Sequence, residues 1–226
     1  MIAQICEESK CTGCLACMNL CPCGAITCQE REDGNVIPQI DPEKCIECHR
    51  CVQGCPENHV KEKHEPRQCY ATWQKDRKER KYSASGGIAF GFYKRWIQNA
   101  GIVYGAAFNE KGILTQQKAE TLEEARKFRG SKYVQSYNGF SYSEIGKELK
   151  KGKKVLFIGT PCQIAGLKAY LGKASDALVT IDLICHGTPP MSYLEEYIKE
   201  IAGAEKVDRV SFRGEKDYRS EERRVG

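Results

Sequence analysis

The sequence has no run of 18 apolar residues, and its opening, MIAQICEESK, lacks the apolar core of a secretory signal. Neither a membrane-spanning helix nor secretion is therefore expected, and we expect a cytoplasmic protein. Hydrophobic residues make up 41% of the 226 positions. This is enough to build one large domain, or a small domain joined to a medium one, and it excludes disorder over most of the chain.

Several catalytic and nucleotide-binding patterns are also missing. The chain contains neither G-x-G-x-x-G nor G-x4-G-K-[ST], so nothing supports an NAD-binding Rossmann turn or a P-loop. It has no nucleophile elbow on which Ser-His-Asp hydrolysis could rest. The net charge of +5 is too modest to indicate a nucleic-acid module.

Cysteine, in contrast, is abundant and unevenly distributed. Of 14 cysteines, all but Cys162 and Cys185 lie at or before Cys69. Without a secretory signal, such usage indicates metal ligation or redox chemistry in a reducing compartment rather than disulfides. Residues 1–60 hold four Lys/Arg against nine Asp/Glu, net −5, which leaves +10 for residues 61–226. Composition and charge thus change together, and this predicts a domain boundary followed by a basic, solvated linker over residues 61–82.

The N-terminal cysteines form an internal repeat. Residues 11–22 are CTGCLACMNLCP and residues 45–56 are CIECHRCVQGCP, the same C-x2-C-x2-C-x3-C-P pattern at an offset of 34. In such a pattern three cysteines bind one 4Fe–4S cluster, and the fourth, before proline, binds the cluster of the other copy. The predicted ligand sets are Cys11, Cys14, Cys17 and Cys55 for one cluster, and Cys45, Cys48, Cys51 and Cys21 for the other.

Zinc is the alternative for paired C-x2-C motifs, but it has no use for a third cysteine at this spacing or for a crossed fourth. The surrounding CPCGAIT and REDGNVIPQIDPEKC resemble bacterial two-cluster ferredoxins, with a hairpin turn at Asp33-Gly34-Asn35. Four cysteines remain outside the pattern, and we expect each to be a packed, inert thiol: Cys6, Cys23, Cys28 and Cys69.

From residue 83 onward, helical and strand-like stretches alternate, which predicts a largely parallel α/β sheet with both faces covered. The expected helices include residues near 88–97 and 121–128, 142–150, the IAGLKAYLG stretch and 192–203; the expected strands are 101–108, 154–159 and 177–185. The segment 121–128 should begin with Thr121 as N-cap and Glu124 completing a capping box.

Two loops in this part lie where parallel sheets bind ligands, beyond the carboxyl ends of strands. Thr160 and Pro161 predict a capped helix start whose free N–H groups could face an anion or a flavin edge. Cys162 would lie in the first turn, where a thiolate is stabilised and suited to metal ligation. A capped helix with a buried cysteine explains the same residues. Cys185 leaves the next strand at the same edge, so the two cysteines could face each other.

The segments of this part together resemble the coenzyme F420 hydrogenase/dehydrogenase beta-subunit family. The resemblance spans about residues 65–213 and rests on motifs that occur in one order: Cys69-Tyr70-Ala71, SASGGIAF (83–90), GIVYGAAF (101–108), FRGSKYVQS (128–136), VLFIGTPCQIAGLK (155–168) and IDLICHGTP (181–189). The fold expected is an α+β ferredoxin-like 2×(4Fe–4S) domain followed by an incomplete α/β domain with a largely parallel sheet.

The resemblance implies an iron–sulfur flavoprotein oxidoreductase subunit that moves electrons between a two-electron donor, coenzyme F420 or similar, and 4Fe–4S clusters through FAD. The implied flavin-binding residues are Ser85, Gly86, Gly87, Arg129, Gly130, Ser131, Lys132 and Thr160. Cys162 and Cys185 would hold a possible third 4Fe–4S cluster, completed by a C-x-x-C further along. The implied partner is a redox protein or a deazaflavin-type small molecule, and not a nucleic acid.

The alternative function is a ferredoxin-like electron carrier without flavin or substrate of its own. The predicted domains are the two-cluster domain at 1–60, the linker at 61–82, the α/β oxidoreductase domain at 83–218, and a tail at 219–226. The ending RSEERRVG does not continue the family pattern and resembles translated adapter sequence, so we expect a C-terminally truncated chain.

Overall fold

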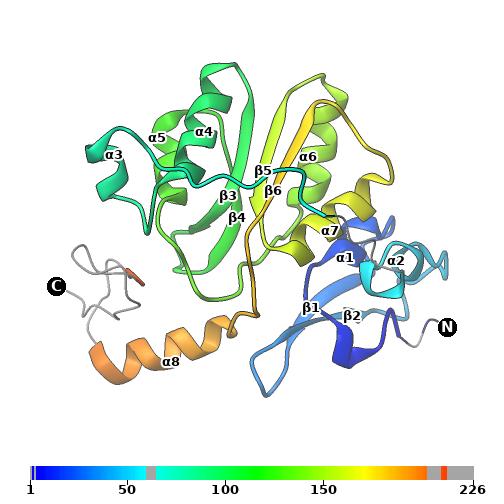
Figure 1. The fold of residues 1–226 in the computed structure, drawn as a ribbon. Coiled ribbons are helices and arrows are strands. Elements are labelled where there is room, and N and C mark those ends of the chain that lie inside the picture. Colours follow the sequence, from blue (N-terminus) through cyan, green and yellow to red (C-terminus); the bar gives the residue numbers. More distant parts are fainter. Residues whose placement is uncertain (1, 3, 60–64, 203–209, 213–226) are drawn as a thin grey trace. The chain divides into compact units, whose positions relative to one another are not determined.

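The fold is that of a computed structural model, which describes residues 2, 4–59, 65–202 and 210–212 (Figure 1). The chain forms two compact units, each built from two stretches: residues 1–65 with 137–186, and residues 66–136 with 187–226. The predicted boundaries divide the chain into consecutive segments, whereas each of these units combines two separate stretches that pack together. Residues 61–64 of the predicted linker, and the predicted tail at 219–226, lie outside the described residues.

The N-terminal part of the first unit is a small α+β module. Its elements are η1 (Glu8–Lys10), α1 (Ala16–Leu20), β1 (Ile26–Glu30), β2 (Val36–Ile40), α2 (Arg50–Gln53) and η2 (Pro56–Asn58). Strands β1 and β2 pair antiparallel, with Ile26 opposite Ile40. The predicted turn joins them: Gly34 has a φ of 77°, and the backbone N–H of Asn35 donates to the Asp33 carboxylate at 3.0 Å.

The two copies of the repeat meet at one pair of equivalent positions. Leu20 ends α1, and Gly54, 34 residues later, follows α2. A Cβ atom on Gly54 would lie 2.1 Å from Cδ1 of Leu20. The large residue of one copy therefore fills the space that the other copy leaves empty, and equal residues at both positions would not pack.

The rest of the first unit is an α/β segment made of α6 (Ser141–Lys150), β5 (Val155–Gly159), α7 (Pro161–Leu171) and β6 (Leu178–Asp182). Strands β5 and β6 pair in parallel, with Gly159 opposite Asp182. The predicted strand 177–185 was too long: β6 ends at Asp182 because β5 ends at its partner, and the Leu183 N–H donates the last bond to the Gly159 carbonyl.

The second unit contains α3 (Arg77–Lys81), α4 (Ile88–Gln98), β3 (Ile102–Phe108), β4 (Leu114–Ala119), α5 (Leu122–Ala125), η3 (Arg126–Phe128) and α8 (Met191–Ala202). Strands β3 and β4 pair antiparallel, and β4 was not predicted because its LTQQKA sequence is mostly polar. The capping box of Thr121 and Glu124 is present as predicted.

The predicted fold class is confirmed, with a ferredoxin-like module ahead of an α/β part. In the α/β part, β5 and β6 pair in parallel and are connected through α7, which is the expected strand–helix–strand pattern. The β3–β4 hairpin is antiparallel. Among the described helices, none has both the length and the apolar character needed to cross a membrane.

Candidate metal centres

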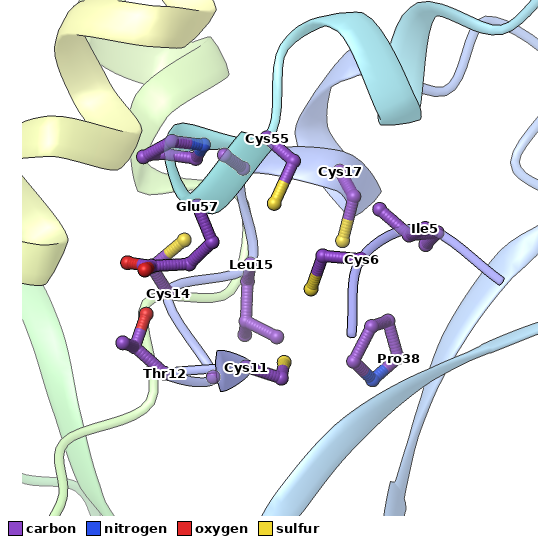
Figure 2. A pocket seen from close by; sticks show the side chains of 13 residues that line it. Ile5, Cys6, Cys11, Thr12, Cys14, Leu15, Cys17, Pro38, Cys55 and Glu57 are labelled. Atoms are coloured by element: carbon purple, nitrogen blue, oxygen red, sulfur yellow. The ribbon is translucent and has the colours of Figure 1, made fainter. Parts of the chain in front are cut away.

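The first hollow in the N-terminal module is bordered by five cysteines. It encloses about 340 Å³ of empty space, part of it open to solvent. Its cysteines are Cys6, Cys11, Cys14, Cys17 and Cys55. Figure 2 shows the sulfur atoms of Cys6, Cys11, Cys17 and Cys55 pointing into this space. The four residues predicted to bind one cluster are thus brought together, including Cys55 from the other repeat.

The second hollow has the complementary composition. It encloses about 300 Å³ and is lined by Cys21, Cys23, Cys45, Cys48 and Cys51. Cys21, from the first repeat, joins the three leading cysteines of the second repeat, as the crossed pattern predicts. Among the described residues, no three His, Cys, Asp or Glu side chains are grouped closely enough to share a single metal ion. The thiols instead border open space.

The backbone of both cysteine loops has the same unusual conformation. Gly13 and Leu15, on either side of Cys14, have φ angles of 63° and 62°. Their equivalents around Cys48, Glu47 and His49, have φ angles of 54° and 57°. A left-handed conformation costs a non-glycine residue roughly 1–2 kcal/mol, so three such residues in two short loops require compensation. Alternating left-handed residues turn successive N–H groups to one side, forming a concavity that binds anions and iron–sulfur clusters.

Burial raises the pKa of Cys6 and Cys14 in the first hollow. Burial, with smaller contributions from the neighbouring Cys55 and Cys11, raises the pKa of Cys6 to about 12. It raises the pKa of Cys14 to about 11 despite an opposing hydrogen bond from the Ala16 backbone. A bound cluster supplies the positive iron that makes the thiolate form favourable, so these positions fit ligands that ionise only on metal binding.

The first cysteine loop is fastened to the start of α6. The Tyr142 hydroxyl and the Asn138 side-chain amide both donate to the Cys14 carbonyl, at 2.9 and 3.0 Å. Asn138 also donates to the Tyr142 hydroxyl at 2.9 Å. On the same side, the Asn19 amide donates to the Gly139 carbonyl at 2.8 Å and accepts from the Ser143 N–H at 3.1 Å. The loop that carries Cys14 is therefore held by the α/β segment of its own unit.

These fastening residues were not found by sequence reasoning. Asn138 and Tyr142 are 3% and 0% exposed, and nothing in their local pattern distinguishes them from ordinary residues at a helix start. Their role depends on contacts more than 120 positions away in the sequence.

Cys162 and Cys185 follow adjacent parallel strands. Each lies three residues beyond the paired strand ends Gly159 and Asp182, so both belong to one edge of the β5–β6 pair. The Cys162 sulfur and the Thr160 hydroxyl are 3.1 Å apart. The Thr160 N–H donates to the Gln163 side chain at 3.1 Å, which gives α7 the expected capped start. The charge of Cys162 also acts on Cys14, so this cysteine lies near the first hollow.

The predicted flavin residues of the second unit fall into two groups. Ser85, Gly86 and Gly87 precede α4, whose N-cap Gly87 has a φ of 75° and makes no side-chain cap. Gly86 has a packing reason of its own, since a Cβ there would lie 2.9 Å from the Thr72 carbonyl oxygen. The first turn of α4 nevertheless has N–H groups without a capping side chain, as an anion-binding helix start requires.

The second group, Arg129 to Lys132, is largely engaged within the unit. Lys132 donates to three backbone carbonyls, those of Ala106, Lys127 and Arg129, at 2.9, 3.1 and 3.0 Å. Arg129 pairs with Glu79, and its guanidinium lies 3.8 Å from the centre of the Phe90 ring. Gly130, with a φ of 78°, has no atom near its missing side chain. Ser131 is half-buried.

Two buried donors near these groups lack partners among the described residues: Nε of Arg129 and Nε2 of Gln74. Gln74 lies against the loop before α4, where its backbone N–H donates to the Gly86 carbonyl at 2.8 Å. Unpaired buried donors are rare in folded proteins, so these two fit a polar ligand at this part of the second unit.

The expectation of four inert, packed cysteines was wrong in part. Cys23 and Cys69 are exposed, and Cys28 lies 3.8 Å from the Tyr137 hydroxyl. Cys6 and Cys23 line the two hollows, and the Cys23 sulfur is 3.7 Å from that of Cys21. For Cys6 and Cys23, the general tendency of cysteine to be an inert buried thiol failed because these residues lie beside loops that turn thiols toward a common space.

Comparison with known proteins gives matches to both parts of the chain. Residues 10–59 match the 4Fe-4S dicluster domain, and residues 152–224 match the C-terminal part of the coenzyme F420 hydrogenase/dehydrogenase beta-subunit family. A component of the Na⁺-translocating ferredoxin:NAD⁺ oxidoreductase complex of Acetobacterium woodii is 44% identical over 48 residues, 21% of this chain and 13% of that protein. A component of an ion-translocating oxidoreductase complex of Methanosarcina acetivorans is 37% identical over 59 residues, 26% of this chain and 20% of that protein.

The chain thus spans a fifth or less of the length of these two relatives. Among solved structures, one of the F420-reducing [NiFe] hydrogenase complex from Methanosarcina barkeri aligns with a TM-score of 0.47 and 21% identity, over 63% of this chain and 54% of that chain. The crossed cysteine repeat lies inside the first family match, and α7 and β6 lie inside the second. The chain therefore combines a segment that matches the 4Fe–4S dicluster domain with a segment that matches the C-terminal part of the coenzyme F420 hydrogenase/dehydrogenase beta-subunit family.

Proposed function

We propose that this chain is the electron-transferring part of a cytoplasmic iron–sulfur flavoprotein oxidoreductase. The observation that carries the proposal is the pair of cysteine-lined hollows, each completed by a cysteine of the other repeat and bordered by the same left-handed backbone. This arrangement supports one 4Fe–4S cluster in each hollow, with Cys11, Cys14, Cys17 and Cys55 as ligands of the first and Cys21, Cys45, Cys48 and Cys51 as ligands of the second.

When bound, each cluster takes up and releases one electron at a time. The chain's own residues determine how the two sites can be used. Cys48 of the second hollow is exposed, and the neighbouring Ile46 is 63% exposed. The loop of the first hollow is held by Asn138 and Tyr142 at the start of α6. We infer that the first site exchanges electrons with the α/β segment and that the second site exchanges them with an outside redox partner.

The α/β part is proposed to take electrons in pairs from coenzyme F420 or a similar two-electron donor, by way of FAD. Three features support a flavin: the family match over residues 152–224, the uncapped start of α4 after Ser85-Gly86-Gly87, and the unpaired donors of Arg129 and Gln74. Lys132, with three carbonyls around its ammonium group, is better explained as a positioning residue for the Arg129–Gly130 turn than as a phosphate ligand. We also propose that Thr160 contributes to flavin binding and that Cys162 and Cys185 are ligands of a third 4Fe–4S cluster.

A second candidate, a ferredoxin-like carrier without flavin, is favoured by the internal pairing of Arg129 with Glu79 and of Lys132 with carbonyls, because neither charge is free for a phosphate. Denaturing the purified chain distinguishes the two. A yellow chromophore released into solution supports the flavoprotein, whereas absorption from clusters alone supports the carrier.

The cluster assignment is tested by iron content after anaerobic reconstitution. Two four-iron clusters give about eight irons per chain, and about four or fewer would contradict the assignment. The crossing is tested with Cys21→Ala combined with Cys23→Ala, because Cys23 lies beside Cys21 and could replace it. We expect this variant to lose the cluster of Cys45, Cys48 and Cys51 and to keep the other.

A further inference from the structure

Cys6 occupies a distinctive place in the first hollow. It lies five residues before Cys11, and the equivalent position in the second repeat, five residues before Cys45, is Ile40. Both residues line their respective hollows. The internal symmetry therefore places a thiol on the wall of one cluster site where the other has a hydrocarbon side chain.

Cys6 lines the same hollow as two predicted ligands, Cys11 and Cys55, and both contribute to the raised pKa of its thiol. Figure 2 shows the Cys6 sulfur pointing into the same space as theirs. The segment is held there by neighbouring contacts: the Asn58 amide donates to the Ile5 carbonyl at 2.8 Å and to the Val52 carbonyl at 2.9 Å, which ties the residue before Cys6 to the end of α2. Ile5 itself is 7% exposed and belongs to the core of the module.

We propose that Cys6 is an interchangeable fifth ligand of the first cluster, able to bind the iron that Cys11 would otherwise bind. The inference rests on the proposed function, because it requires a cluster in this hollow. Its chemistry is ligand exchange: the Fe–S bond to Cys11 breaks and the Cys11 sulfur takes up a proton, one Fe–S bond forms at the Cys6 sulfur as that thiol loses its proton, and no electron is transferred. Because Cys6 and Cys11 line the same hollow, Cys6 can replace Cys11 as a ligand without a thiol from outside that hollow.

Cys6 gives the first site a spare thiol at a position where the second site has Ile40. Loss of Cys11 by substitution leaves another cysteine on the wall of the same hollow. In the second hollow the corresponding wall residue, Ile40, has no atom that can bind iron. Once Cys23, the extra thiol of the second hollow, is also removed, the two clusters should therefore respond differently to loss of their first cysteine.

The test compares iron content and electron paramagnetic resonance spectra of anaerobically reconstituted full-length variants. We expect about eight irons per chain for the wild type, for Cys6→Ala and for Cys11→Ala, and about four for the double variant Cys6→Ala/Cys11→Ala. The matched control is Cys45→Ala combined with Cys23→Ala, which removes the first ligand of the second hollow and its extra thiol. We expect about four irons in this control.

Each outcome bears on the proposal. Cys11→Ala with about four irons, or with about seven and the signal of a three-iron cluster, would overturn it, because Cys6 would not be binding. A double variant or a control that keeps about eight irons would also overturn it, since a fifth thiol would be unnecessary. The cluster remaining in the untouched hollow shows that each variant is folded. A wild type with fewer than about eight irons would instead contradict the proposed function itself, so the two failures are distinguishable.

Discussion

Replacing Tyr142 with phenylalanine should loosen the first cluster and leave the second unaffected. The Tyr142 hydroxyl, which is fully buried, donates to the Cys14 carbonyl and accepts from Asn138, both at 2.9 Å. The substitution removes two hydrogen bonds and leaves one amide hydrogen of Asn138 buried without an acceptor. At about 1 kcal/mol for each lost bond, the opening of this loop should become easier by about 2 kcal/mol.

A change of about 2 kcal/mol raises the population of the open loop roughly 30-fold, and cluster loss that proceeds through this opening should accelerate by the same factor. The assay is the decay of cluster absorption after a chelator is added anaerobically, which should show one phase for each cluster. Only the phase of the first hollow should accelerate. Tyr193→Phe is the control, because that ring is 56% exposed and the change removes a hydroxyl without burying an unpaired group.

Two results would refute the reasoning. Equal acceleration of both phases would mean that Tyr142 acts on the stability of the whole unit and not on the Cys14 loop. An unchanged first phase would mean that cluster loss does not proceed through opening at this carbonyl. Asn138→Leu, which removes both amide donors, should have an effect at least as large as that of Tyr142→Phe.

Three further predictions follow from local geometry. His49→Val should accelerate loss of the second cluster, because a β-branched residue is strained at a φ of 57°, whereas His49→Gly should not; equal effects would refute a backbone role. Gly54→Ala should destabilise the module by about 1–3 kcal/mol, because the added Cβ would clash with Cδ1 of Leu20. Adding Leu20→Ala in the same chain should restore part of the free energy of unfolding measured by denaturation. Burial lowers the pKa of Lys132 to about 8 from 10.5. Between these pH values the unfolded chain therefore binds more protons than the folded chain. The Lys132 contribution to the free energy of unfolding should then rise with pH. In urea unfolding, the free energy of unfolding of the wild type should gain this contribution between roughly pH 7.5 and pH 9.5, and Lys132→Met should lack it.

The grouping of the cysteines around two hollows could be predicted from the sequence because it depends on spacing at short range. The spacing around Cys11 and Cys45 determines which thiols share a loop, and the proline after Cys21 and Cys55 marks the residue that crosses to the other copy. The same is true of the capping box at Thr121, which depends on contacts three residues apart. Such features need no knowledge of tertiary structure.

Features that depend on distant partners could not be predicted in this way. The end of β6 is determined by the length of β5, and the positions of Asn138 and Tyr142 gain their meaning from the carbonyl of Cys14. The polar strand β4 has little apolar alternation and forms because β3 offers it a partner. Cys6 is intermediate: comparison with Ile40 at the offset of 34 marks it as unusual, but only the hollow shows that its thiol faces the ligands.

The two halves of the repeat thus supply the same number of predicted ligands to each hollow but differ in the residues that surround them. The first loop is fastened by Asn138 and Tyr142, which hold it against opening, and its hollow has the additional thiol of Cys6 where the second has Ile40. The second site has an exposed ligand in Cys48 beside the exposed Ile46, which suits approach by another protein. A duplicated module that only stored electrons would gain nothing from this inequality. The proposed function, in which electrons move between the α/β part and an outside partner, requires one accessible cluster and one held against the α/β segment, and the two sites fit these two roles.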